Sequence, residues 1–144
     1  MATRAYPKFY LNDAQQNLAV MFDYALRTLK YDGDQFFLYF IQSQVAEKFG
    51  HANPKYIAGL SGIELCQNVL SKIDATPNFP SNPRIKQGKE FWLGWVLAYY
   101  QWYSGLKFSD LQEYGLTPSS ILARYILHEA DISKFVSTAN KIIL

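Results

Sequence analysis

The segment FWLGWVLAYYQWY, residues 91–103, decides the fold of this 144-residue chain, because it holds all three tryptophans and no charged residue. Trp92, Trp95, Tyr99, Trp102 and Tyr103 recur at steps of three and four residues, which predicts one shared helical face. Apolar residues cover much of the other side too, as is typical of a helix inside a core or across a membrane. Thirteen residues are too few for a bilayer, which needs about 20. The segment therefore predicts a buried central helix at about residues 87–104.

The rest of the chain also has helical periodicity. Asn12 or Asp13 can cap a first helix, and residues 34–49 predict a second helix that carries Gln44 on its apolar stripe. Ser61 and Glu64 have the spacing of a capping box, which opens another helix. No period-2 pattern of useful length appears. The predicted fold is all-α, a single compact domain of six or seven helices around the central aromatic helix.

Prolines at positions 77, 80 and 83 predict an irregular connection, because each removes a backbone N–H donor. The prediction is an N-terminal helical half at 1–73, a linker at 74–84 and a C-terminal helical half at 85–144. Both halves are short enough to share one core, so the whole chain, 1–144, is predicted to be one domain.

Composition excludes several classes of function. A net charge of +2, with no concentrated basic face, does not favour nucleic acid as a partner. Cys66 is the only cysteine, so neither an intramolecular disulfide nor a cysteine zinc site can form. The first residues lack the apolar run of a signal peptide, so a cytoplasmic location and no membrane association are expected.

The most reactive string is His128-Glu129-Ala130-Asp131. It is not a zinc-protease motif, because no second histidine follows at i+4. The only other histidine, His51, lies in the other half, so we expect no metal site and no cofactor. The structural interpretation is that Asp131 caps the last helix.

A turn-rich loop includes Asn53, Lys55 and Tyr56 and leads to the helix that Ser61 opens. Its backbone N–H groups could bind an anion there, although two successive helix caps explain the same residues and are favoured. No phosphate loop, Ser-His-Asp triad or nucleophile elbow is present, so no catalytic residue is assigned.

The strings Asn53-Pro54-Lys55-Tyr56, Ser61-Gly62-Ile63-Glu64-Leu65, Trp95 to Trp102 and His128-Glu129-Ala130-Asp131 resemble a family of small bacterial proteins of unknown function. The resemblance covers nearly the whole chain and transfers no catalytic role. It implies a gene neighbourhood with ADP-ribosyltransferase-like and short helix-turn-helix proteins, similar to toxin–antitoxin loci. Gln44 and His51 depart from the family pattern.

The first functional hypothesis is a non-catalytic interaction or regulatory protein, an antitoxin-like partner of a neighbouring ADP-ribosyltransferase-like protein. The alternative is a small-ligand binder or enzyme whose pocket lies between the two halves, lined by aromatics that include Tyr100. Helix-turn-helix DNA binding through residues 109–125 has little basic support. Homo-oligomerisation stays open. The candidate binding residues are Asn53, Lys55, Tyr56, Trp92, Tyr99, Tyr103, His128, Glu129 and Asp131.

Overall fold

The computed structural model describes residues 4–51, 53–73, 77–80 and 83–143, and it confirms the all-α class, with no strand in those ranges. The α-helices are α1 (Leu11–Asp23), α2 (Gly33–Gln42), α3 (Val45–Gly50), α4 (Pro54–Ile57), α5 (Gly62–Lys72), α6 (Lys89–Ser104), α7 (Phe108–Glu113), α8 (Pro118–Leu122) and α9 (Ile132–Ile143). Two 3-10 helices, η1 (Lys8–Tyr10) and η3 (Tyr125–Glu129), and a π-helical turn, η2 (Tyr24–Thr28), complete the described elements. None of the described helices is long and apolar enough to cross a membrane.

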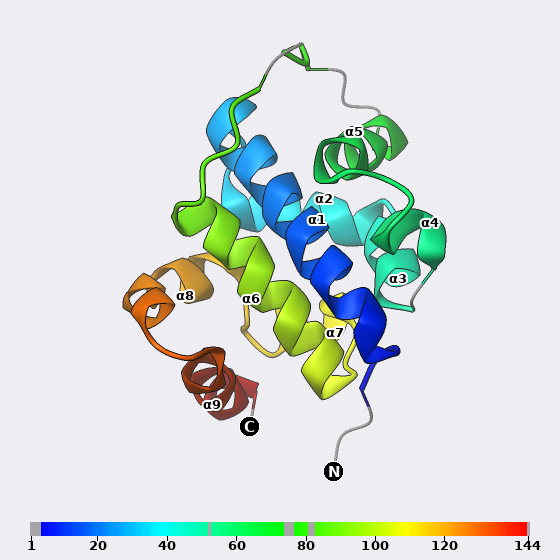
Figure 1. The fold of residues 1–144 in the computed structure, drawn as a ribbon. Coiled ribbons are helices and arrows are strands. Elements are labelled where there is room, and N and C mark those ends of the chain that lie inside the picture. The colour runs from blue at the N-terminus through cyan, green and yellow to red at the C-terminus, as the bar shows by residue number, and fades with distance from the viewer. Residues whose placement is uncertain (1–3, 52, 74–76, 81–82, 144) are drawn as a thin grey trace.

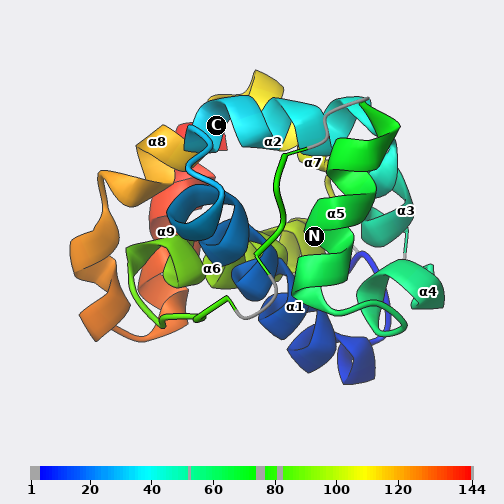
Figure 2. The ribbon, with the colours of Figure 1, turned by 90° about the horizontal axis from the view of Figure 1, so that it is seen from above.

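The centre of the fold is a pair of helices, α1 and α6, which lie side by side in both views (Figure 1, Figure 2). Helices α3, α4 and α5 lie beyond α1, and α8 and α9 lie beyond α6 (Figure 1). A Cβ at Gly94 of α6 would collide with the Leu18 carbonyl oxygen and lie 2.6 Å from the Cα of Ala19. On the other side of α1, a Cβ at Gly62 would lie 2.5 Å from the Asn17 carbonyl oxygen. Two glycines therefore let α6 and α5 approach the α1 backbone from opposite sides.

Helix α6 is central, as predicted, but it is buried on one side and not nearly all round. The fully enclosed side chains of this helix include Leu93, Val96 and Leu97, and the small residues Gly94 and Ala98 sit among them. Small residues permit the closest backbone approach, so the side of α6 that carries them faces α1 and forms the core. The side chains of the aromatic face lie at the edge of the core and stay partly exposed, except that of Trp102, which is buried.

Trp102 is covered by the N-terminal segment and is only 7% exposed. The Ala5 N–H donates to the Trp102 carbonyl oxygen at 2.9 Å, and the indole Nε1 donates to the Tyr6 carbonyl oxygen at 2.8 Å. The Arg4 guanidinium lies 4.1 Å from the centre of the Tyr103 ring and donates to the Tyr103 carbonyl oxygen. These contacts fix residues 4–6 along the C-terminal half of α6.

More helices form than the six or seven predicted, because the predicted second helix is broken between α2 and α3. Gln44 adopts φ 71°, a left-handed conformation, and does not lie on an apolar helical stripe. Helix α8 ends at Leu122, and the chain then forms the 3-10 helix η3, which carries His128. Around the first break, the rings of Phe37, Phe40, Phe49 and Phe108 pack with centroids 5.2–6.4 Å apart.

Some predicted helix caps are confirmed and others are wrong. The Ser61–Glu64 capping box is present, with backbone-to-side-chain hydrogen bonds of 3.1 and 2.9 Å. The Asp131 carboxylate accepts a hydrogen bond from the Ser133 N–H at the start of α9, as a cap would. Neither Asn12 nor Asp13 caps α1, which already begins at Leu11.

The predicted linker falls partly outside the described residues, at 74–76 and 81–82. Its far end is tied to α1, because the Lys86 N–H donates to the buried Asp23 carboxylate at 3.2 Å. Side chains from the two predicted halves contribute to one hydrophobic core, in which Leu18 and Phe22 of the first half join Leu93 and Leu97 of the second.

Candidate functional site

The candidate site is a row of four half-buried aromatic side chains on the open face of α6, called here the aromatic stripe. Its members are Trp92, Trp95, Tyr99 and Tyr103, at steps of three, four and four residues. Because a helix rises 1.5 Å per residue, the stripe is roughly 16 Å long. The rings of Tyr99 and Tyr103 stack with centroids 6.4 Å apart and an interplanar angle of 15°. The stripe is therefore a row of aromatic rings along one helical face that the fold leaves partly open.

Two hollows flank the tryptophan end of the stripe, with volumes of about 330 and 370 Å³. Trp92, Trp95 and His128 line both of them. The first hollow extends toward Gln16 of α1, and the second toward Asp131 at the start of α9. The two tryptophans thus form a ridge between two spaces that could each accept a side chain or a small molecule.

His128 is held in place by its neighbour three residues earlier. Its Nδ1 lies 2.6 Å from the Tyr125 carbonyl oxygen, so that nitrogen must carry a proton and donate it. The imidazole also stacks on the Tyr125 ring, with centroids 4.1 Å apart and an angle of 8°. The Tyr125 ring in turn contacts Trp92 edge-on at 5.5 Å. The exposed His128 is therefore fixed in position where it lines both hollows.

The Asp131 carboxylate is the acidic group at this end. Hydrogen bonds from the Ser133 side chain and backbone lower the pKa of Asp131 below its usual value. Asp131 therefore stays ionised near neutral pH and contributes a fixed negative charge beside Trp92 and Trp95. Glu129 is exposed on η3 and lines neither hollow.

The structure brings together only part of the predicted site. Trp92, His128 and Asp131 meet at the second hollow, and Tyr99 and Tyr103 continue the stripe away from it. Tyr100, expected to line the pocket, is instead 2% exposed. Its hydroxyl donates to the Asn140 side chain at 2.6 Å and its ring packs edge-on against Phe135, so it belongs to the core beneath α9.

The remaining predicted residues lie apart, around α4. The Asn53 side chain accepts from the Lys55 N–H and caps that helix. Tyr56 is buried, with the ammonium groups of Lys48 and Lys55 5.4 and 5.6 Å from its ring centre. The Ser61 N–H, which an anion at the α5 start would use, is already bonded to Glu64. The favoured interpretation of this loop as successive caps matches these contacts.

Sequence reasoning missed Tyr125 and left Trp95 out of the candidate binding set, although Trp95 lines both hollows. The spacing of Tyr125 and His128 at i and i+3 was an available signal, since these positions align on a 3-10 helix.

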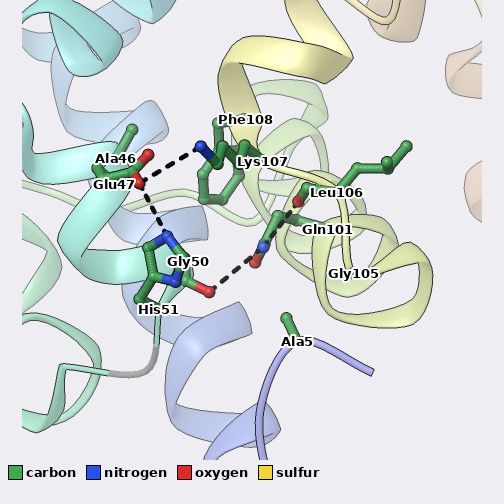
Figure 3. Close-up of a pocket in the computed structure, with 10 residues that line it drawn as sticks. All are labelled: Ala5, Ala46, Glu47, Gly50, His51, Gln101, Gly105, Leu106, Lys107 and Phe108. Carbon is green, nitrogen blue, oxygen red and sulfur yellow. Dashed lines mark hydrogen bonds and ion pairs between the residues drawn. The ribbon is translucent and has the colours of Figure 1, made fainter. Parts of the chain in front are cut away.

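A second, polar cleft of about 70 Å³ lies where the ends of α3 and α6 meet the start of α7 (Figure 3). Gln101, 2% exposed, donates through Nε2 to the Leu106 carbonyl oxygen at 2.9 Å and more weakly to the Gly50 carbonyl oxygen at 3.5 Å. Glu47 lies 2.8 Å from His51 and 3.9 Å from Lys107 (Figure 3).

This cleft was not predicted, since its residues come from distant segments. The Glu47–His51 pair could exchange a proton, but no serine, threonine or cysteine lines the cleft to act as a nucleophile. The amide of Gln101 bridges two carbonyl oxygens, so its evident role is to hold the end of α3 against the end of α6.

Other reactive groups offer no further site. Within the described ranges, no three His, Cys, Asp or Glu side chains cluster closely enough to hold a metal ion. Cys66 is buried in the core, and burial raises the pKa of its thiol to about 12. A thiol with that pKa is not a reactive nucleophile in the folded protein.

Comparisons of the chain with protein-family models, with curated proteins and with solved structures find no match.

Proposed function

We propose that this protein is a non-catalytic interaction protein that binds another protein through the aromatic stripe of α6. The observation that carries the proposal is that Trp92, Trp95, Tyr99 and Tyr103 remain partly exposed along one face of α6, a helix without a charged residue between Phe91 and Ser104. Tyrosine and tryptophan are the side chains most enriched among the anchors of protein interfaces. They bury a large area while losing little conformational freedom.

The chemistry around the stripe favours binding over catalysis. His128 and Asp131 line the hollows, but each is engaged in a local hydrogen bond, to the Tyr125 carbonyl oxygen and to Ser133. Neither hollow is lined by serine, threonine or cysteine, the usual nucleophiles of covalent catalysis. The hollows on either side of the tryptophan ridge are suited to receiving apolar side chains of a partner.

The resemblance to small bacterial proteins suggests who the partner is. On that basis we propose an antitoxin-like or regulatory role, in which the stripe binds the ADP-ribosyltransferase-like product of a neighbouring gene. A partner that presents a basic residue beside an apolar anchor would complement the ionised Asp131 at the tryptophan end.

The test is co-purification with each product of the adjacent genes, comparing wild type with Trp95→Ala. We expect one product to be retained by wild type and lost with Trp95→Ala. The matched control is Tyr114→Ala, which removes an aromatic ring that is 51% exposed elsewhere on the surface and should leave binding intact. Thermal melts show that both variants are folded. Equal retention of the partner by wild type and Trp95→Ala would refute the stripe as the binding surface.

A small-ligand-binding function is the second candidate, and the hollows favour it. Volumes of about 330 and 370 Å³ fall in the range of small-molecule sites, which is about 300–1,000 Å³. Native mass spectrometry of the purified protein is the distinguishing measurement. A stoichiometric small molecule that disappears in Trp95→Ala, together with no retained partner, would establish this candidate instead of the first.

A further inference from the structure

We propose that the aromatic stripe binds a second copy of this chain, with the two α6 helices antiparallel around a two-fold axis. The inference rests on the proposed function, because it concerns the same surface, and it names what covers that surface when no partner is bound. A two-fold interface requires one patch that complements itself. The stripe meets that requirement in its spacing and in its charge.

The spacing of the stripe is close to symmetric about its middle. If a second α6 runs antiparallel across the first, Trp92 lies opposite Tyr103 of the other copy and Trp95 lies opposite Tyr99. The midpoint between Trp92 and Tyr103 and the midpoint between Trp95 and Tyr99 differ by less than one residue, and one residue is about 1.5 Å along a helix. Each tryptophan then packs against a tyrosine, and the steps of three and four residues match those by which paired helices interlock.

Exposed side chains of opposite charge lie at the two ends of the stripe, Arg4 at the tyrosine end and Asp131 at the tryptophan end, where Lys89 of α6 is also exposed. At the tyrosine end, the Arg4 guanidinium lies over the Tyr103 ring and is exposed. At the tryptophan end, the exposed Asp131 lines the hollow beside Trp92. Antiparallel pairing brings the end that carries Arg4 in each copy to the end that carries Asp131 in the other, and the two-fold axis repeats this pairing. A parallel pairing would instead place like charges together at both ends.

The four aromatic side chains do not make a complete interface alone. A specific interface buries about 800 Å² of each partner, more than four half-buried side chains expose. Gln16 of α1 and the 76%-exposed Ile126 of η3 lie on elements beside the stripe and would add to the contact. A dimer with this limited apolar area is expected to be reversible, so a protein partner can displace the second copy.

Reversing the charges of Arg4 and Asp131 tests the proposed dimer. If these residues only stabilised the fold of one copy, mixing the two variants would not restore dimers. Molar mass is measured by light scattering across a concentration series for wild type, Arg4→Glu, Asp131→Arg and an equimolar mixture of the two variants. Wild type should approach the dimer mass as concentration rises. Each variant alone should dimerise about a hundredfold more weakly or worse, because like charges then meet at both ends of the axis. The mixture should regain dimers, since every contact in the mixed pair again joins opposite charges.

Two matched variants, Lys72→Glu and Glu113→Arg, reverse exposed charges outside the stripe and should dimerise as wild type does. Circular dichroism shows that all variants are folded. A wild type that stays monomeric, or a mixture of folded variants that gains no dimer over the single variants, overturns the proposal.

The co-purification experiment distinguishes failure of the dimer proposal from failure of the proposed function. A monomer that still loses its partner in Trp95→Ala refutes only the self-association. A charge-dependent dimer with no partner supports the self-association and refutes the proposed role.

Discussion

Replacing Gly94 with alanine tests the contact between the α1 and α6 backbones. In an exposed helix this change would raise the free energy of unfolding by about 1 kcal/mol, because alanine is the better helix former. Here the new Cβ would collide with the Leu18 carbonyl oxygen and lie 2.6 Å from the Ala19 Cα, and no rotamer change can move these backbone atoms. Overpacking in a core costs about 1–3 kcal/mol, and immovable neighbours put this site at the upper end. We expect a net loss of about 2 kcal/mol or more.

Urea denaturation followed by far-ultraviolet circular dichroism measures that loss. The matched control is Gly88→Ala, whose Cβ would meet no atom closer than 3.9 Å and which should change the free energy of unfolding by less than about 1 kcal/mol. If Gly94→Ala is as stable as wild type at an unchanged denaturant slope, the reasoning is refuted. The close approach of α1 and α6 would then cost nothing to relax and could not decide which face of α6 is buried.

Four more outcomes are expected. Trp95→Ala should lower the free energy of unfolding by about 1–2 kcal/mol in denaturant titration, short of the 3–5 kcal/mol for a fully buried aromatic, because its side chain is only partly buried. Burial raises the pKa of Asp23 above its unfolded value, so the folded state binds its proton more tightly. The stability of wild type relative to Asp23→Asn should therefore fall as pH rises from about 4 through the raised pKa, and a parallel pair of pH–stability curves would contradict this. Cys66 should react with a thiol reagent at pH 8 only at the rate of unfolding, and immediate labelling of the native protein would show that it is accessible. His128→Gln should melt with a change of about 1–2 kcal/mol or less, typical of one lost hydrogen bond, and should still bind its partner, so loss of all cellular effect in a folded variant would point to chemistry at His128.

The bounds of α6 could be predicted closely from sequence, and its orientation could not. The expected helix, 87–104, matches Lys89–Ser104, because its end is set locally by Gly105 at φ 71°. Both sides of this helix are apolar, so periodicity alone cannot tell which faces the core. The small residues Gly94 and Ala98 determine which side is buried, because the backbone of α1 can approach only where the side chains of α6 are small. A pattern of hydrophobic residues does not take side-chain size into account.

Other differences have equally specific causes. The break at Gln44 depends on a left-handed backbone conformation. Glycine or asparagine at this position would have predicted that conformation, but glutamine does not. The polar cleft joins Glu47 to Lys107 and Gly50 to Gln101, pairs separated by more than fifty residues, for which one sequence contains no signal. At the candidate site, Trp92, His128 and Asp131 were identified by residue type, but their meeting depends on η3 folding back against α6.

The backbone contact between Leu18 and Gly94 also has a consequence for synthesis of the chain. These residues are 76 positions apart, and ribosomes add about 5–20 residues per second. Helix α1 therefore leaves the ribosome about 4–15 s before its partner α6 follows. During that interval the side of α1 at Leu18 has no α6 to cover it. Helix α5 is made earlier and contacts the opposite side of α1, so the N-terminal part of the nascent chain would depend on α5, or on a chaperone, until residue 104 emerges.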